Sequence, residues 1–177
     1  TDLSVGAVTA LSSVLVASFS GTNNPLLILL FPIAVGTLLG FANGMIVGKL
    51  GVAPFISSLG MMMIARGIAL VITSGNSVPM DPVSKGWITG MAESAFLGIG
   101  SPIWVFAAAA AIGIYATRKT RFGRSIYAVG GNEDAARMMG IQPERVKIAV
   151  YTISGCASAL AGVILASRLG SGQPVTC

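Results

Sequence analysis

The sequence is poor in charge and contains no histidine. Only 10% of its 177 residues are Asp, Glu, Lys or Arg, whereas an ordinary soluble domain carries about 25%. Hydrophobic residues make up 54% of the chain, and its mean hydropathy is +0.83. A chain this short cannot bury that much apolar surface in one soluble core. The composition therefore predicts an integral membrane protein or a piece of one.

The absences also exclude several kinds of functional site. Without histidine there is no His-based zinc site, Ser-His-Asp triad or Cys-His dyad. Cys156 and Cys177 are too few for a disulfide framework, and we expect two isolated thiols. The nearest approach to a Walker A loop, at 48–50, lacks the upstream glycine and the Ser/Thr. We therefore expect no catalytic residue, no metal site and no nucleotide bound by this chain itself.

Long stretches without charge predict membrane-spanning helices. No charged residue occurs between Leu3 and Gly48, and the turn at 21–25 divides this run in two. About 20 residues, at 1.5 Å each, cross a bilayer as a helix. Five spans are predicted: 3–20, 25–48, 52–73, 102–117 and 148–167. The predicted fold class is an all-α integral membrane protein, a polytopic helical bundle.

The two long polar segments differ in charge. Segment 118–147 carries a net charge of +4 from seven basic and three acidic residues: Arg118, Lys119, Arg121, Arg124, Arg137, Arg145 and Lys147 against Glu133, Asp134 and Glu144. Segment 74–101 is a Gly- and Pro-punctuated loop with one basic residue, Lys85. Within it, 83–97 is expected to form a short interfacial helix with Trp87 at the headgroup level.

This asymmetry predicts the orientation in the membrane. Loops rich in Lys and Arg stay in the cytoplasm, so 118–147 is predicted to be cytoplasmic and 74–101 external. Alternation of the spans then places Lys49 inside and both the 21–25 turn and the C-terminal tail outside. The overall net charge of +5 therefore marks membrane topology and does not indicate a surface for nucleic acid.

Four glycines recur at strict four-residue spacing in the second predicted span: Gly36, Gly40, Gly44 and Gly48. Small residues on one helix face allow close backbone approach, which drives helix association in lipid. We expect this stripe to pack against another helix of the same subunit. The alternative is that the stripe faces a substrate path or a second subunit. The span 148–167 repeats the pattern with Ser154, Ser158 and Gly162.

Three residues are weak candidates for contacts with a transported substrate. Arg66 is the only ionisable group well inside a predicted span, and such residues are functional candidates by default. It is also expected near the outer interface, where we favour snorkelling or ion pairing as the explanation. Asn43 is polar and lies within the glycine stripe, and Phe55 is added as an equally weak candidate.

Residues 132–139 have the signals of a complete short helix. Asn132 is a good N-cap, Glu133 and Asp134 complement the helix dipole, and Gly140 favours a left-handed stop. A two-turn helix is marginal alone in water, so we expect a partner surface to hold it. We expect its exposed side to dock into a groove of a soluble protein, through Ala135, Ala136, Met138 and Met139. The alternative is a solvated, capped turn.

Three blocks resemble a known family of membrane proteins. Residues 122–141 resemble the cytoplasmic loop of ABC-transporter permeases of the ribose/xylose/galactose/autoinducer class, which are related to branched-chain amino acid permeases. Residues 2–6, Asp-Leu-Ser-Val-Gly, and the block at 54–67 resemble two further family motifs in the same order. Members are about twice this length, so the resemblance implies that the chain is an internal piece of a longer protein. The missing initiator Met agrees with this expectation.

The resemblance implies both a function and partners. Residues 131–141 would be the coupling helix that contacts a separate ABC ATPase subunit: Gly131, Asn132, Glu133, Asp134, Ala135, Ala136, Arg137, Met138, Met139, Gly140 and Ile141. ATP and Mg²⁺ would bind that ATPase, so no cofactor is expected on this chain. An external sugar-binding protein would deliver a sugar such as ribose or xylose. A second permease copy and membrane lipid complete the expected partners, in a bacterial inner membrane.

Two other classes remain as alternatives. A non-ABC polytopic transporter would use an ion gradient, for which the sequence offers no evident buried carboxylate. A structural membrane subunit would have no translocation path. An intramembrane enzyme is disfavoured, because the spans offer only hydroxyls, Asn43 and Arg66 as polar groups.

Overall fold

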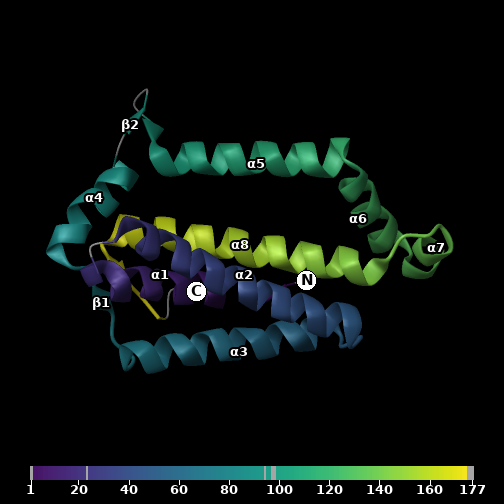
Figure 1. Ribbon diagram of the computed structural model, residues 1–177, viewed down its shortest axis with the longest axis horizontal. Coiled ribbons are helices and arrows are strands. Elements are labelled where there is room, and N and C mark those ends of the chain that lie inside the picture. Colours follow the sequence, from purple (N-terminus) through teal and green to yellow (C-terminus); the bar gives the residue numbers. More distant parts are fainter. Residues whose placement is uncertain (1, 23, 94, 97–98, 175–177) are drawn as a thin grey trace.

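The chain forms an elongated bundle of helices in the computed structural model (Figure 1). The structure describes residues 2–22, 24–93, 95–96 and 99–174. The helices are α1 (Val5–Phe19), α2 (Pro25–Lys49), α3 (Pro54–Thr73), α4 (Pro82–Glu93), α5 (Ser101–Lys119), α6 (Arg121–Gly131), α7 (Glu133–Met138) and α8 (Pro143–Leu169), and a 3-10 turn, η1 (Ser20–Thr22), follows α1. The all-helical fold class predicted from the sequence is confirmed.

Four helices are long and apolar enough to cross a membrane. They are α1 with its 3-10 extension, α2, α3 and α8. The predicted span 102–117 is helical along the whole of α5, yet α5 is not among these four. None of its described residues is buried, and Figure 1 shows it apart from the other long helices. The count of five spans therefore stays a prediction.

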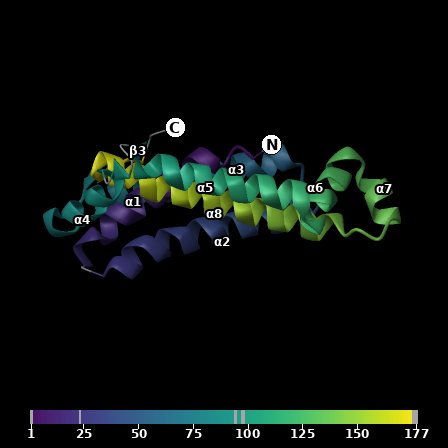
Figure 2. The same cartoon turned by 90° about the horizontal axis from the view of Figure 1, so that it is seen from above.

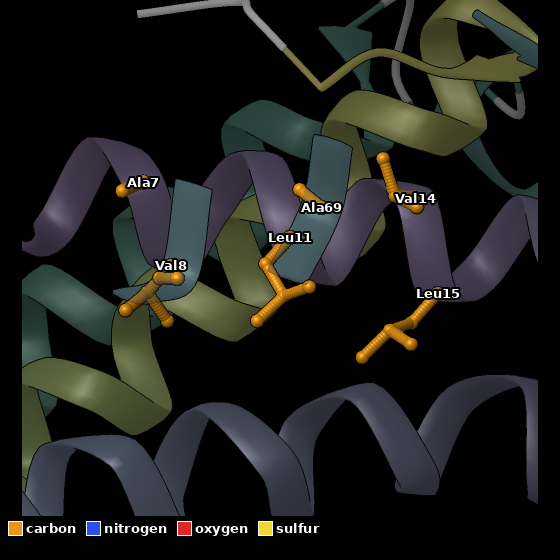
Figure 3. Packing of buried hydrophobic residues seen from close by; sticks show 7 residues of the cluster. Ala7, Val8, Leu11, Val14, Leu15 and Ala69 are labelled. Atoms are coloured by element: carbon orange, nitrogen blue, oxygen red, sulfur yellow. The ribbon is translucent and has the colours of Figure 1, made fainter. Parts of the chain in front are cut away.

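Helix α1 is the inner helix of the bundle. In the structure, 61% of its most apolar segment is buried, compared with 22% of that of α2 and 28% of those of α3 and α8. In Figure 3, Val8, Leu11 and Leu15 point from α1 toward the neighbouring helix. That helix is α2, because a Cβ added at Gly36 would lie 3.2 Å from Val8 Cγ1. The outer helices keep apolar side chains exposed, as helices facing lipid or further protein do.

Polar elements gather at the two ends of the bundle. The α4 end holds α4, the strand β1 (Val78–Pro79), and the strand β4 (Ser171–Gly172). The α7 end holds α6 and α7, which project beyond the long helices in both views (Figures 1 and 2). Eight of the eleven basic residues lie in the segments at the α7 end: Lys49, Arg118, Lys119, Arg121, Arg124, Arg137, Arg145 and Lys147.

Segment 74–101 is more ordered than the loop that the sequence predicts. It contains α4, close to the expected interfacial helix at 83–97, and a small hairpin of β2 (Ala95–Phe96) and β3 (Ile99–Gly100). Strand β1 pairs antiparallel with β4, so the segment after α8 is a strand partner of the segment after α3. The side chain of Trp87, and the whole of Cys177, lie outside the described residues.

Helix α6 corrects the interpretation of 118–147 as a loop with a single helix. Phe122, Ile126 and Val129 recur at helical spacing and give α6 one apolar face. Thr120 starts the helix, because its Oγ1 accepts a hydrogen bond of 3.1 Å from the amide of Gly123. Arg121 and Arg124 lower the mean hydropathy of this segment. A search for uncharged stretches therefore overlooks this helix.

Candidate functional site

The short helix α7 is fixed at both ends by its own sequence. Asn132 Oδ1 accepts a hydrogen bond of 3.0 Å from the amide of Ala135. Gly140 has a φ of +79°, the left-handed conformation that ends a helix. The capping predicted for Asn132 and Gly140 is therefore confirmed. Both caps are local, so α7 forms at this place whatever surface lies against it.

A chain of three ion pairs ties α7 to the first turns of α8. Lys147 Nζ donates to Glu133 Oε2 at 2.6 Å, Arg137 Nη2 lies 3.5 Å from Glu133 Oε1, and the same Nη2 lies 2.5 Å from Glu144 Oε1. The charges alternate along this chain, so each group has an opposite neighbour. Partly exposed pairs contribute little individually. Together they hold α7 in its orientation relative to the first turns of α8.

The pairing acts on the ionisation of Glu133. The hydrogen bond from Lys147 is the main cause that holds the pKa of the Glu133 carboxyl below its ordinary value of 4.5. Burial acts in the opposite direction, and the charge of Lys147 and the contact with Arg137 add smaller downward effects on this pKa. A lowered carboxyl pKa means that the contacts are fully formed above pH 4.5 and are lost as pH falls through the lowered value. Glu133 is thus ionised, and α7 is held to α8, throughout the physiological range.

The exposed side of α7 differs from the prediction at one residue. Met138 is 91% exposed and Met139 69% exposed, and Ala135 is exposed as well. Ala136 is 0% exposed, so its place on the docking side is wrong. The cause is tertiary, because α7 packs against both α6 and α8. The two methionines are the adaptable apolar groups available to a partner.

The glycine stripe of α2 lies against α8. A Cβ at Gly36 would lie 2.5 Å from Ala159 Cβ, and one at Gly40 would lie 2.9 Å from Gly155 Cα. Further along, a Cβ at Gly44 would lie 2.8 Å from Ile148 Cα, and one at Gly48 would lie 2.9 Å from the Glu144 carbonyl oxygen. All four glycines therefore face one helix of the same chain, and α2 and α8 touch through backbone.

The three candidates for substrate contacts do not come together. Asn43 is fully buried, and its Oδ1 accepts a hydrogen bond of 2.5 Å from Ser57 Oγ in the first turns of α3. Phe55, two residues earlier, is 57% exposed and so points away from this pair. Arg66 lies nine residues after Ser57, about 14 Å along the helix. No single site contains all three.

A partly buried polar contact that the sequence did not reveal lies at Asp2. Its Oδ2 accepts a hydrogen bond of 2.8 Å from Ser154 Oγ, and its Oδ1 accepts one of 2.6 Å from Ser4 Oγ. Ser154 is eleven residues after Pro143 in the 27-residue helix α8. Asp2 therefore lies near the middle of the bundle along its length, and not at the membrane surface where the start of a predicted span at 3–20 would place it. The Asp-x-Ser spacing favours an Asx turn and was the available signal.

A cavity of about 380 Å³ opens beside this contact, between α6 and α8. Asp2, Tyr151 and Ser154 line its inner end, and Lys147 lines the end near α7. Its walls are the apolar side chains of both helices, among them Ile126 of α6. A second cavity, of about 160 Å³, lies near the α4 end and is lined almost entirely by apolar atoms.

Metal coordination finds no support in the part of the chain that the structure describes. No group of three or more His, Cys, Asp or Glu residues lies close enough there to hold a metal ion. Cys156 is a free thiol on α8.

Comparison with known proteins identifies related chains. Residues 1–176 match the family described as "Branched-chain amino acid transport system / permease component". The chain is 39% identical over 180 residues to the ribose import permease protein RbsC of Haemophilus influenzae, and 44% identical over 175 residues to that of Bacillus subtilis. Each alignment covers 98% of this chain and 54% of the relative.

A further relative is named for a different sugar. The chain is 40% identical over 134 residues to the L-arabinose transport system permease protein AraH of Escherichia coli, across 76% of this chain and 40% of the relative. No solved structure matches. The chain thus spans about half the length of the curated relatives it matches. It belongs to the branched-chain amino acid transport system permease family, as an all-helical, multi-pass membrane protein.

Proposed function

We propose that this chain is the central part of a permease subunit in an ATP-driven importer of small sugars. The observation that carries the proposal is α7, a doubly capped helix with two exposed methionines, ion-paired to a long apolar helix at the basic end of the bundle. The family match and relatives named for ribose and L-arabinose support transport of a pentose or similar sugar.

In this proposal a separate ABC ATPase subunit docks on residues 131–141. ATP and Mg²⁺ bind to that subunit, and closure of its nucleotide-binding domains displaces α7 as a rigid body. The ion pairs from Glu133 and Arg137 pass the displacement to α8. Because α8 and α2 meet through backbone at the glycine stripe, the two helices move together. Rocking of this pair would open the path alternately to each side.

The orientation follows from charge. Loops rich in Lys and Arg stay in the cytoplasm, so the α7 end would face the cytoplasm of a bacterial inner membrane. The α4 end would face an external sugar-binding protein. The exposed apolar side chains of the outer helices would contact lipid, the rest of the subunit and a second permease copy.

Reconstitution tests this function. The full-length permease that contains this chain is placed in proteoliposomes with its ATPase and a sugar-binding protein, and uptake of labelled ribose, xylose and arabinose is measured. We expect uptake of at least one sugar that requires Mg-ATP and all three proteins. The partly buried carboxylate of Asp2 makes an ion-driven transporter the alternative to examine. Uptake driven by an imposed proton or sodium gradient, without ATPase, would contradict the proposal.

A further inference from the structure

Tyr151 has an unused hydroxyl beside the partly buried carboxylate of Asp2. The residue is only 8% exposed, and within the described part of the chain no hydrogen bond of its hydroxyl is found. The hydroxyl oxygen itself is not fully buried, so it is open to the space beside it. Tyr151 lines the same cavity as Asp2 and Ser154. A donor without a partner and a carboxylate therefore face one space, and this arrangement indicates a ligand.

The cavity has the size and position of a small-molecule site on a path to the α7 end. Its volume of about 380 Å³ falls within the range of roughly 300–1,000 Å³ typical of ligand pockets. From Ser154 to Lys147 it follows seven residues of α8, about 10 Å at helical rise. It thus connects the middle of the bundle with the turns of α8 that hold α7.

The lining selects among ligand classes. The Asp2 carboxylate accepts hydrogen bonds and disfavours anions, while the Tyr151 hydroxyl both donates and accepts. Metal cations such as Ca²⁺ take six or more oxygen ligands, more than these side chains supply. The charge of Lys147 is taken up by Glu133 at 2.6 Å. The remaining walls are aliphatic side chains, such as Val146 and Val150, which suit the C–H faces of a sugar ring.

We propose that this cavity binds a neutral monosaccharide on its way to the cytoplasm, with Asp2 accepting from a sugar hydroxyl and Tyr151 donating to another. The proposal rests on the proposed function, and it assigns the sugar a place within the bundle. Ser154 holds the Asp2 carboxylate in position through the hydrogen bond of 2.8 Å. Because α8 carries both Tyr151 and Lys147, movement of α7 would change the cavity that holds the sugar.

Tyr151→Phe in the full-length permease tests the assignment, because it removes one hydroxyl and preserves the ring. Tyr115→Phe on the exposed face of α5 is the matched control. Losing a hydrogen bond of about 1 kcal/mol predicts a roughly five- to tenfold lower uptake rate at subsaturating ribose for Tyr151→Phe alone. Equal rates for the two variants would overturn the assignment, provided that the unaltered permease imports ribose.

A binding measurement separates this inference from the proposed function. Val150→Cys, in the wall of the cavity, is made in the full-length permease without its native cysteines, and its labelling by a methanethiosulfonate reagent is followed in detergent without ATPase. We expect ribose or L-arabinose to slow the labelling, and Tyr151→Phe to weaken this protection. Protection without ATP-driven uptake would support the site and reject the importer. Unchanged labelling at saturating amounts of both sugars would reject the site.

Discussion

Gly40→Ala is expected to force α2 and α8 apart and to destabilise the whole bundle. The added methyl group would collide with the carbonyl oxygen of Tyr151 and lie 2.9 Å from Gly155 Cα. Both obstacles are backbone, which no side-chain rotation can move aside. Overpacking of this kind destabilises a protein by about 1–3 kcal/mol. We expect a lower apparent melting temperature of the full-length permease in detergent, measured by thermal shift.

Gly60→Ala on α3 is the matched control for this substitution. A Cβ at Gly60 would have no atom of the described structure within 4 Å. Replacing an interior helix glycine by alanine favours the helix by roughly 0.5–1 kcal/mol. We therefore expect an unchanged or slightly higher melting temperature. Equal losses for Gly40→Ala and Gly60→Ala would show that the α2–α8 contact does not govern stability.

Met138→Glu is expected to abolish sugar uptake while leaving the protein folded and inserted. Met138 is 91% exposed, so its replacement does not disturb α7 itself. A charge in the centre of an apolar interface removes packing and leaves a carboxylate without a partner. We predict at least about a tenfold loss of ATP-driven uptake, measured in proteoliposomes together with ATP hydrolysis.

Met138→Leu is the conservative control, because it keeps an apolar side chain of similar size and we expect it to retain uptake. Ala136→Glu is less informative, although the sequence analysis expects Ala136 on the docking side of the helix. Ala136 is fully buried, so a carboxylate there would disrupt α7 even without a partner protein. Normal uptake by Met138→Glu would contradict the assignment of α7 to the surface that contacts the ATPase.

Local signals in the sequence predict the parts of the site that are formed locally. Asn132 and Gly140 cap α7 through contacts within a few residues, and such contacts depend only on neighbouring amino acids. The regular spacing of the glycine stripe likewise predicts a close helix contact. The sequence does not say which helix meets the stripe, because that depends on residues 96 to 123 positions away on α8.

The features that the sequence did not reveal depend on long-range contacts. Asp2 reads as the polar start of a span, and only the contact with Ser154, 152 positions away, places it inside the bundle. Burial of Ala136 accompanies the packing of α7 against α6 and α8, which a helix considered alone does not show. The unused hydroxyl of Tyr151 becomes visible only when α6 and α8 enclose a common cavity.

The contact between α7 and an ATPase subunit is the central claim, and disulfide cross-linking tests it most directly. In the full-length permease without its native cysteines, Met138→Cys and, as control, Tyr115→Cys are each combined with single cysteines on the ATPase surface. Both sites are exposed, but only the first lies on α7. We predict rapid cross-linking at position 138, changed by ATP, and none at position 115. Absence of a cross-link at 138 with every ATPase cysteine would contradict the claim.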